Sequence, residues 1–190
     1  AASDVYKRQI DDWIMWLPTT KGFFSPRNVK SVHAYGIESR LDIGAEPWRG
    51  WVFDFSANYS WTPSVNRGPA MSPSDKSVGR QLPYVPRHSA ALTASVTWRR
   101  WSLLYKWAYY SERFTMSSNE STLTGRLPAY YMSNVTLSRS LSFHPVDLQL
   151  KLAVNNLFDE EYLSVLSRPM PGINFEFFIS VTPRFASKSK

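Results

Sequence analysis

The sequence predicts an all-β fold, namely an antiparallel, up-and-down transmembrane β-barrel segment of about eight strands. Three observations predict it. Apolar and polar residues alternate with the period of a β-strand, long connections alternate with short ones, and Trp and Tyr gather near the ends of the apolar faces. Such a sheet has one apolar and one polar face, so the question is whether the apolar face contacts lipid or a protein core.

The composition narrows the class of protein further. Of 190 residues, 22 are Lys or Arg and 15 are Asp or Glu, which gives a net charge of +7. The chain contains no cysteine, which excludes a disulfide framework and a Cys-ligated metal site. It also contains no run of about 18 apolar residues that could form a transmembrane helix. If this chain crosses a membrane, it must therefore cross with strands.

Eight stretches show the strand pattern: residues 6–17, 29–43, 51–61, 89–98, 101–112, 131–141, 147–155 and 173–182. The first is the least regular, because the apolar residues of "DDWIMW" fall in both phases. The second alternates through "AYGIESRLDI", and the third, "WVFDFSANYSW", alternates almost without a fault. A bare two-residue turn separates the fourth and fifth, "SAALTASVTW" and "WSLLYKWAYY". In the last three, apolar residues recur mostly at every second position, as in "DLQLKLAVN" and "INFEFFISVT".

The connections between these stretches are sorted by length. Residues 44–50, 99–100 and 142–146 form short links, whereas residues 62–87, 115–128 and 159–172 form long ones. Because long and short links alternate along an up-and-down sheet, all the long ones emerge on one side. Outer-membrane barrels have this layout, with short periplasmic turns and long extracellular loops. A soluble two-sheet sandwich gives no reason for such sorting.

The alternation divides the strand residues into two faces. We expect the polar set to face a lumen: Glu38, Arg40, Asp42, Asp54, Asn58, Lys106, Glu112, Lys151, Asn155 and Glu176. We expect the aromatic residues near the ends of the apolar set to form a lipid-facing girdle: Trp51, Tyr59, Trp61, Trp98, Trp101, Tyr109 and Tyr131. The alternative is that these aromatics belong to the core of a sandwich, where Trp and Tyr are also common. Together with the sorted loops, the pattern favours the membrane.

Recognition by such a scaffold is expected in the long loops, because loops on a rigid framework carry function. The candidates for ligand contact are charged and amide residues: Arg67, Lys76, Arg80, Asn119, Glu120, Arg126 and Arg168. Guanidinium and ammonium groups suit a carboxylate- or phosphate-bearing ligand or lipopolysaccharide. No basic helix or nucleic-acid motif collects the positive charge, so we expect no nucleic-acid partner.

No catalytic or metal site is predicted. His33, His88 and His144 are far apart in the sequence, and none has a second candidate ligand at metal spacing. The carboxylate pairs at 11–12 and 160–161 are adjacent, so a strand would point their members to opposite faces. We therefore expect no catalytic residue, no metal and no cofactor.

Three stretches resemble the TonB-dependent outer-membrane receptors. "NNLFDEEY" at 155–162 is similar to their Asn-Leu-Phe-Asp-x-x-Tyr signature, "SPRNVKSVHAYGIES" at 25–39 to their Asn-Val…Gly-Ile/Val-Glu strand, and "PGINFEFFISVTPRF" at 171–185 to their closing strand. The matching signature positions are Asn156, Leu157, Phe158, Asp159, Tyr162 and Phe185. The resemblance implies a larger barrel of about 22 strands around an N-terminal plug. It also implies the outer membrane of a Gram-negative bacterium, with lipid and lipopolysaccharide around the barrel.

The same resemblance implies a function. TonB, acting through the plug, would drive uptake of a scarce small-molecule ligand such as an iron–siderophore complex or cobalamin. With room for about eight strands and without a plug or TonB box, the chain is expected to be a C-terminal fragment. Residues 10–185 would be barrel and 186–190 a polar tail, while 1–9 would be a non-native or junctional segment or else the end of a real strand. The alternative is a small closed eight-stranded barrel with a structural or adhesive role. The small lumen side chains would underfill such a barrel, which favours the fragment.

Overall fold

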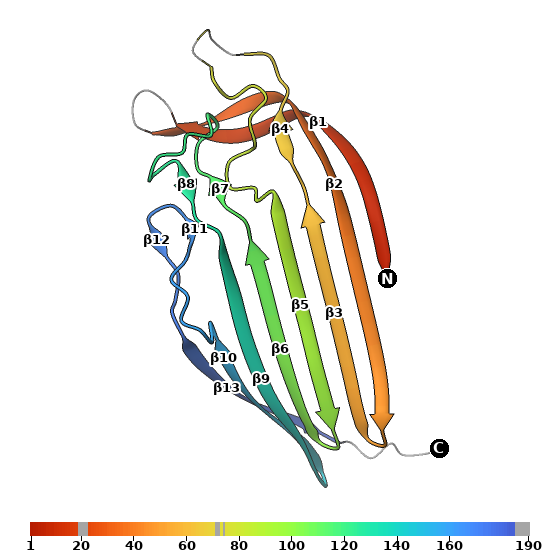
Figure 1. The fold of residues 1–190 in the computed structure, drawn as a ribbon. Coiled ribbons are helices and arrows are strands. Elements are labelled where there is room, and N and C mark those ends of the chain that lie inside the picture. The colour runs from red at the N-terminus through yellow and green to blue at the C-terminus, as the bar shows by residue number, and fades with distance from the viewer. Residues whose placement is uncertain (19–22, 71–72, 74, 185–190) are drawn as a thin grey trace, which may run out of the picture.

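Eight long antiparallel strands run side by side in one curved sheet (Figure 1), in the order β1-β2-β3-β5-β6-β9-β10-β13. The computed structural model of the protein describes residues 1–18, 23–70, 73 and 75–184. The long strands are β1 (Ala2–Pro18), β2 (Phe24–Trp48), β3 (Trp51–Trp61), β5 (His88–Trp98), β6 (Trp101–Tyr110), β9 (Tyr130–Phe143), β10 (Val146–Asn155) and β13 (Asn174–Pro183). This confirms the predicted all-β, up-and-down arrangement. Among the described residues, no helix has the length and apolar character needed to cross a membrane.

The connections separate to the two ends of the sheet, as the sequence predicts (Figure 1). The turns at residues 49–50, 99–100 and 144–145 lie at one end, called here the turn end. The connections at 62–87, 111–129 and 156–173 lie at the other, called the loop end. The loop end also carries short strands that the sequence pattern does not predict. They are β4 (Ser64–Asn66), which pairs with β2, and the pairs β7 (Arg113–Phe114) with β8 (Arg126–Leu127) and β11 (Leu163–Val165) with β12 (Arg168–Pro169).

Some strand ends differ from the sequence prediction. β2 continues past residue 43 to Trp48, with an irregular register between Ala45 and Trp48. Pro47 lies within that irregularity, where a residue without an N–H is tolerated. Glu112, which the sequence places on the polar face of a strand, lies beyond the end of β6. Residues 2–9 continue β1 and pair with β2 from Ala2 opposite Arg40 onward, while their junctional origin stays a prediction.

The pairing register gives the two faces of the sheet directly, because cross-strand partners share a face. One polar row runs across five strands through Asp42, Ser56, Thr93, Lys106 and Asn134. The next row lies on the opposite face and is apolar, with Ile43, Phe55, Ala94, Tyr105 and Val135. Apart from Glu112, all the residues expected to face a lumen share the polar face. That this face lines a lumen stays a prediction.

No second layer covers the apolar face in the part of the chain that the structure describes. Phe175, Phe177 and Ile179 of β13 are more than half exposed. In that same part, β1 pairs only with β2, and β13 pairs only with β10, so the sheet is open at both edges. An exposed apolar face of this size needs lipid or a partner to cover it. The open edges match part of a larger barrel rather than a small closed one.

Candidate functional site at the loop end

The first and second loops are joined by one amide side chain. Asn119 Nδ2 donates to the carbonyl of Gln81 at 2.9 Å, and the Gln81 N–H donates to Asn119 Oδ1 at 2.8 Å. The Asn119 side chain thus takes the place of a backbone partner for Gln81. Its φ of 56° falls in the left-handed region that Asn tolerates. The Tyr84 N–H also donates to the carbonyl of Phe114 at 2.7 Å. The two loops therefore form one hydrogen-bonded unit.

A buried arginine joins the second loop to the third. Arg113, in β7, is 5% exposed, and its Nη2 donates to the carbonyl of Leu163 at 2.9 Å. Its guanidinium carbon lies 4.9 Å from the ring centroid of Tyr130, which in turn stacks on Tyr162 at 4.6 Å. The faces of aromatic rings attract a cation, which compensates part of the cost of burying the charge. All three long loops are thereby tied together.

The "NLFD" signature forms the base of the third loop. Asn156 is 1% exposed; its Oδ1 accepts from the N–H of Glu160 at 2.8 Å, and its Nδ2 donates to the carbonyls of Glu160 and Pro171. Asp159 Oδ1 accepts from the Ile173 N–H at 2.7 Å, next to the start of β13. The signature therefore folds the chain after β10 into a turn that fixes where β13 begins.

Phe185, the last position of the family signature, lies outside the described residues, and so does the tail 186–190. Of the other signature residues, Tyr162 belongs to the aromatic stack above, and the backbone N–H of Leu157 donates to the carbonyl of Ser133 at 2.8 Å. Phe158 is 61% exposed.

A cavity of about 630 Å³ lies between the second and third loops. Its lining includes Tyr130, Glu160, Glu161, Tyr162 and Met170. The lining thus combines two tyrosines with acidic side chains. Its volume falls in the range of small-molecule sites.

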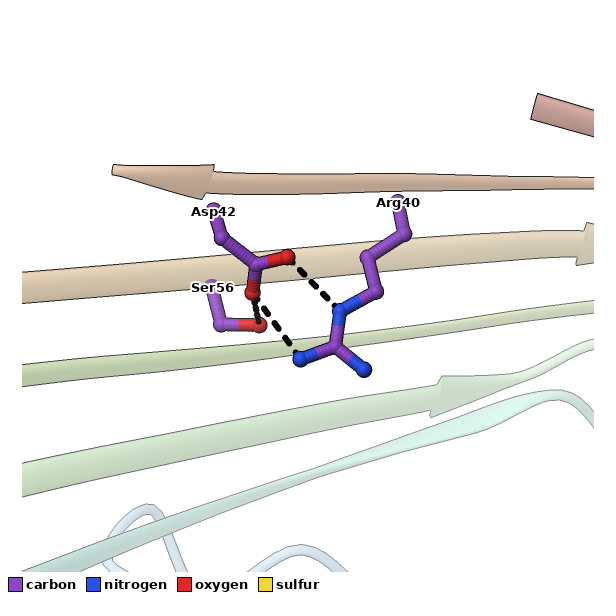
Figure 2. A network of polar contacts seen from close by, with 3 residues as sticks. All are labelled: Arg40, Asp42 and Ser56. Carbon is purple, nitrogen blue, oxygen red and sulfur yellow. Dashed lines mark hydrogen bonds and ion pairs between the residues drawn. The ribbon is translucent and has the colours of Figure 1, made fainter. Parts of the chain in front are cut away.

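The polar face carries a second group of interacting side chains, shown in Figure 2. Arg40 Nε donates to Asp42 Oδ2 at 2.8 Å, Arg40 Nη2 donates to Asp42 Oδ1 at 3.1 Å, and the Ser56 hydroxyl donates to Asp42 Oδ1 at 2.8 Å. Arg40 also borders a hollow of about 530 Å³ on this face, together with Glu38 and Asn58. This face therefore presents fixed charges and amides rather than an apolar core.

The seven predicted ligand-contacting residues are distributed over the three loops. Arg67, Lys76 and Arg80 lie in the first, Asn119, Glu120 and Arg126 in the second, and Arg168 in the third. The side chains of two of them bind within the loops, since Asn119 binds Gln81 and Arg126 Nη1 donates to Glu112 Oε2 at 2.9 Å. That any of the seven contacts a ligand stays a prediction.

Sequence reasoning misses Arg113, Gln81 and Tyr130, which hold the loops together. An arginine just after a strand looks like an exposed loop charge, and the only local signal is its aromatic surroundings in "YYSERF". No group of three or more His, Cys, Asp or Glu able to hold a metal ion occurs among the described residues.

The aromatic residues of the apolar face lie in two rows. Tyr59, Tyr109 and Tyr131 lie in register at the loop end, and Trp51, Trp98 and Trp101 lie in register at the turn end. Trp61, one pleat beyond Tyr59, pairs with Ile37 and His88. The eight residue-to-residue steps from Trp51 to Tyr59 span about 26 Å along β3, which is close to the ~25 Å apolar band of outer-membrane barrels.

Replacing Asn119 by Ala tests the coupling of the first two loops. We expect a local destabilisation of about 1–3 kcal/mol, because the buried N–H and carbonyl of Gln81 lose their partner. The measurement is the rate of protease cleavage in the second loop of the folded protein, which should rise. Glu120→Ala changes the neighbouring exposed residue and should leave the rate unaltered. Equal rates in both variants would show that Asn119 does not couple the loops.

Comparison with known proteins gives the family. The family model described as TonB dependent receptor-like, beta-barrel matches residues 1–157. The fold is similar to that of BauA, the ferric preacinetobactin receptor from Acinetobacter baumannii, with 12% identity, a TM-score of 0.65 and coverage of 94% of this chain and 26% of that one. The siderophore receptor PiuA from Acinetobacter baumannii has 18% identity and a TM-score of 0.64, with 93% of this chain and 25% of that one covered.

The ferric-catecholate import receptor Fiu from E. coli K12 is also similar, with 17% identity, a TM-score of 0.61 and coverage of 96% of this chain and 25% of that one. At these identities the likeness concerns the fold alone. The chain spans about a quarter of the length of these three structures. Because the family model matches 157 of its 190 residues, the chain belongs to the TonB-dependent receptor-like β-barrel family.

Proposed function

We propose that this chain is the C-terminal part of the barrel of an outer-membrane receptor that imports a scarce nutrient, such as an iron–siderophore complex or cobalamin. One observation carries the proposal: the three long loops at one end of the sheet are tied into one unit by Asn119 and Arg113. Loops that are already ordered lose less conformational entropy when a ligand binds. A barrel with a purely structural role does not need such order.

The family supports the wider setting of this function. Its members are receptors of Gram-negative outer membranes rather than enzymes, and they are coupled to TonB. Three structures with a similar fold are named as receptors for iron chelates or siderophores. In the complete protein, TonB would act through a plug that packs on the polar face, while lipid and lipopolysaccharide surround the apolar face.

A growth experiment tests the import function. A strain that lacks the complete protein should grow poorly when either iron or cobalamin is limiting, and the complete gene should restore growth. Restoration should fail in cells without TonB, because import then has no energy source. Normal growth of the mutant under both limitations, while the wild-type protein is inserted in the membrane, would remove the main support for an importer.

Shortening the first loop tests its part in import. Removing residues 69–74 keeps Asn66, which donates to Ser77 Oγ from Nδ2 and to the carbonyl of Arg80 from its backbone N–H, both at 3.0 Å. We expect normal insertion, because loops tolerate deletion, but a several-fold lower uptake of the radiolabelled nutrient that the growth experiment identifies. Unchanged uptake would mean that this loop makes no contact with the nutrient.

A further inference from the structure

Two arginines stack on tryptophans at the turn end of the apolar face. Arg99, in the turn between β5 and β6, has its guanidinium carbon 4.7 Å from the ring centroid of Trp98. Arg139, in β9, has its guanidinium carbon 4.6 Å from the ring centroid of Trp101. Trp98 and Trp101 are cross-strand partners, and Trp101 is also the partner of Arg139. We call these four residues the Arg–Trp belt.

Arg139 interrupts an otherwise apolar row. In β9 it shares a face with Leu137 and Leu141, and its partner on β10 is Leu150. An arginine surrounded by hydrocarbon alone is costly, and a long side chain near a strand end relieves this cost by extending to the headgroup region. The exposed Arg139 side chain therefore marks the level at which the apolar face meets phospholipid headgroups.

Within the described residues, neither arginine of the belt has a carboxylate partner. The three ion pairs there join Arg40 to Asp42, Arg126 to Glu112 and Arg184 to Asp147. Neither the Arg99 nor the Arg139 guanidinium donates a hydrogen bond to a described protein atom. Both retain their positive charge and their planar set of N–H donors for a ligand outside the protein.

The two guanidinium groups of the belt favour a lipid with net negative charge over a zwitterionic one. A guanidinium binds a phosphate through two parallel hydrogen bonds, and an aromatic face fixes the plane of the guanidinium. Tryptophan itself favours the headgroup level of a membrane. We propose that the belt binds the phosphate of an anionic glycerophospholipid in the leaflet on the turn side. Lipopolysaccharide would meet the opposite, loop end, and the site is separate from any step of import.

Native mass spectrometry of the complete protein, released from nanodiscs of phosphatidylethanolamine with a minor fraction of phosphatidylglycerol, tests this site. The wild-type protein should retain phosphatidylglycerol in preference to phosphatidylethanolamine. In the variant R99Q/R139Q, the ratio of retained phosphatidylglycerol to phosphatidylethanolamine should fall roughly fivefold for each arginine removed. R99K/R139K keeps the charge but not the planar set of N–H donors, so its enrichment should lie between those of the wild-type protein and R99Q/R139Q.

R87Q is the control for the single variant R99Q, because it removes the same charge at the loop end, and it should retain the wild-type enrichment. If R99Q/R139Q fails to insert, the single variant R99Q in the exposed turn serves instead. The proposal is overturned if the wild-type protein shows no enrichment or if R99Q/R139Q keeps it. It is also overturned if, in nanodiscs that contain lipopolysaccharide, the substitutions remove lipopolysaccharide rather than phosphatidylglycerol.

Discussion

Replacing Phe55 by Arg is expected to lower the free energy of unfolding of the complete barrel by about 2–4 kcal/mol. Phe55 lies midway between Tyr59 and Trp51 of β3, on the apolar face. Its cross-strand partners are Ile43 and Ala94. An arginine at that depth would transfer its charged guanidinium from water into the middle of the hydrocarbon layer. Urea titration of the protein folded in lipid vesicles measures the loss.

The matched control is Ser95→Arg in the adjacent strand. Ser95 lies on the polar face, where its hydroxyl donates to Asp54 Oδ2 at 3.4 Å. The new charge would face a carboxylate and a polar surface, so we expect a change of less than about 1 kcal/mol. Equal losses at Phe55 and Ser95 would show that the two faces share one environment and would contradict the membrane assignment.

The difference between these faces was predictable because it is a local property of the chain. Within residues 51–61 the alternation is nearly unbroken, and the observed β3 has the same bounds. Where the alternation weakens, the prediction also weakens. β2 continues to Trp48 through Ala45 and Pro47, because cross-strand pairing with β3 holds a segment that has no strand pattern of its own.

The loop network could not be predicted in the same way, because its contacts join residues far apart in the sequence. Arg113 binds the carbonyl of Leu163, fifty positions later, and Asn119 binds Gln81, thirty-eight positions earlier. Near Arg113 the only signal is the aromatic residues of "YYSERF", and they do not identify the third loop as its partner. Composition identified these segments as loops but gave no partner for any side chain in them.

The loop end is ordered by contacts with the sheet as well as by contacts between loops. Tyr130 begins β9 and stacks on Tyr162 in the third loop, so the aromatic stack connects the rigid sheet to the loops. The cavity between the second and third loops is bordered by this stack. Tyr130 thus gives the cavity one side chain held by the sheet, while most of the lining, including Glu160, Glu161 and Met170, comes from the third loop.

Replacing Asn156 by Ala is expected to lower the free energy of unfolding by about 3 kcal/mol. The side chain amide of Asn156 binds the N–H and the carbonyl of Glu160 and the carbonyl of Pro171. At 1% exposure, water cannot easily replace these partners. Asn156 also has a φ of 50°, which Asn adopts more readily than Ala. The lost hydrogen bonds and the unfavourable backbone conformation both lower the free energy of unfolding, and urea titration in lipid vesicles measures their sum.

Asn155→Ala, one residue before the signature, provides the comparison. Asn155 Nδ2 makes one hydrogen bond, to Asn174 Oδ1 at 3.0 Å, so its loss should cost about 1 kcal/mol. If the two variants lose the same stability, Asn156 does not hold the turn between β10 and β13. A larger loss at Asn156, with the ligand affinity of the folded variant unchanged, would assign the "NLFD" signature to chain folding rather than to recognition. Because Asp159 next fixes the N–H of Ile173, just ahead of β13, this turn sets the register with which the last described strand joins the sheet.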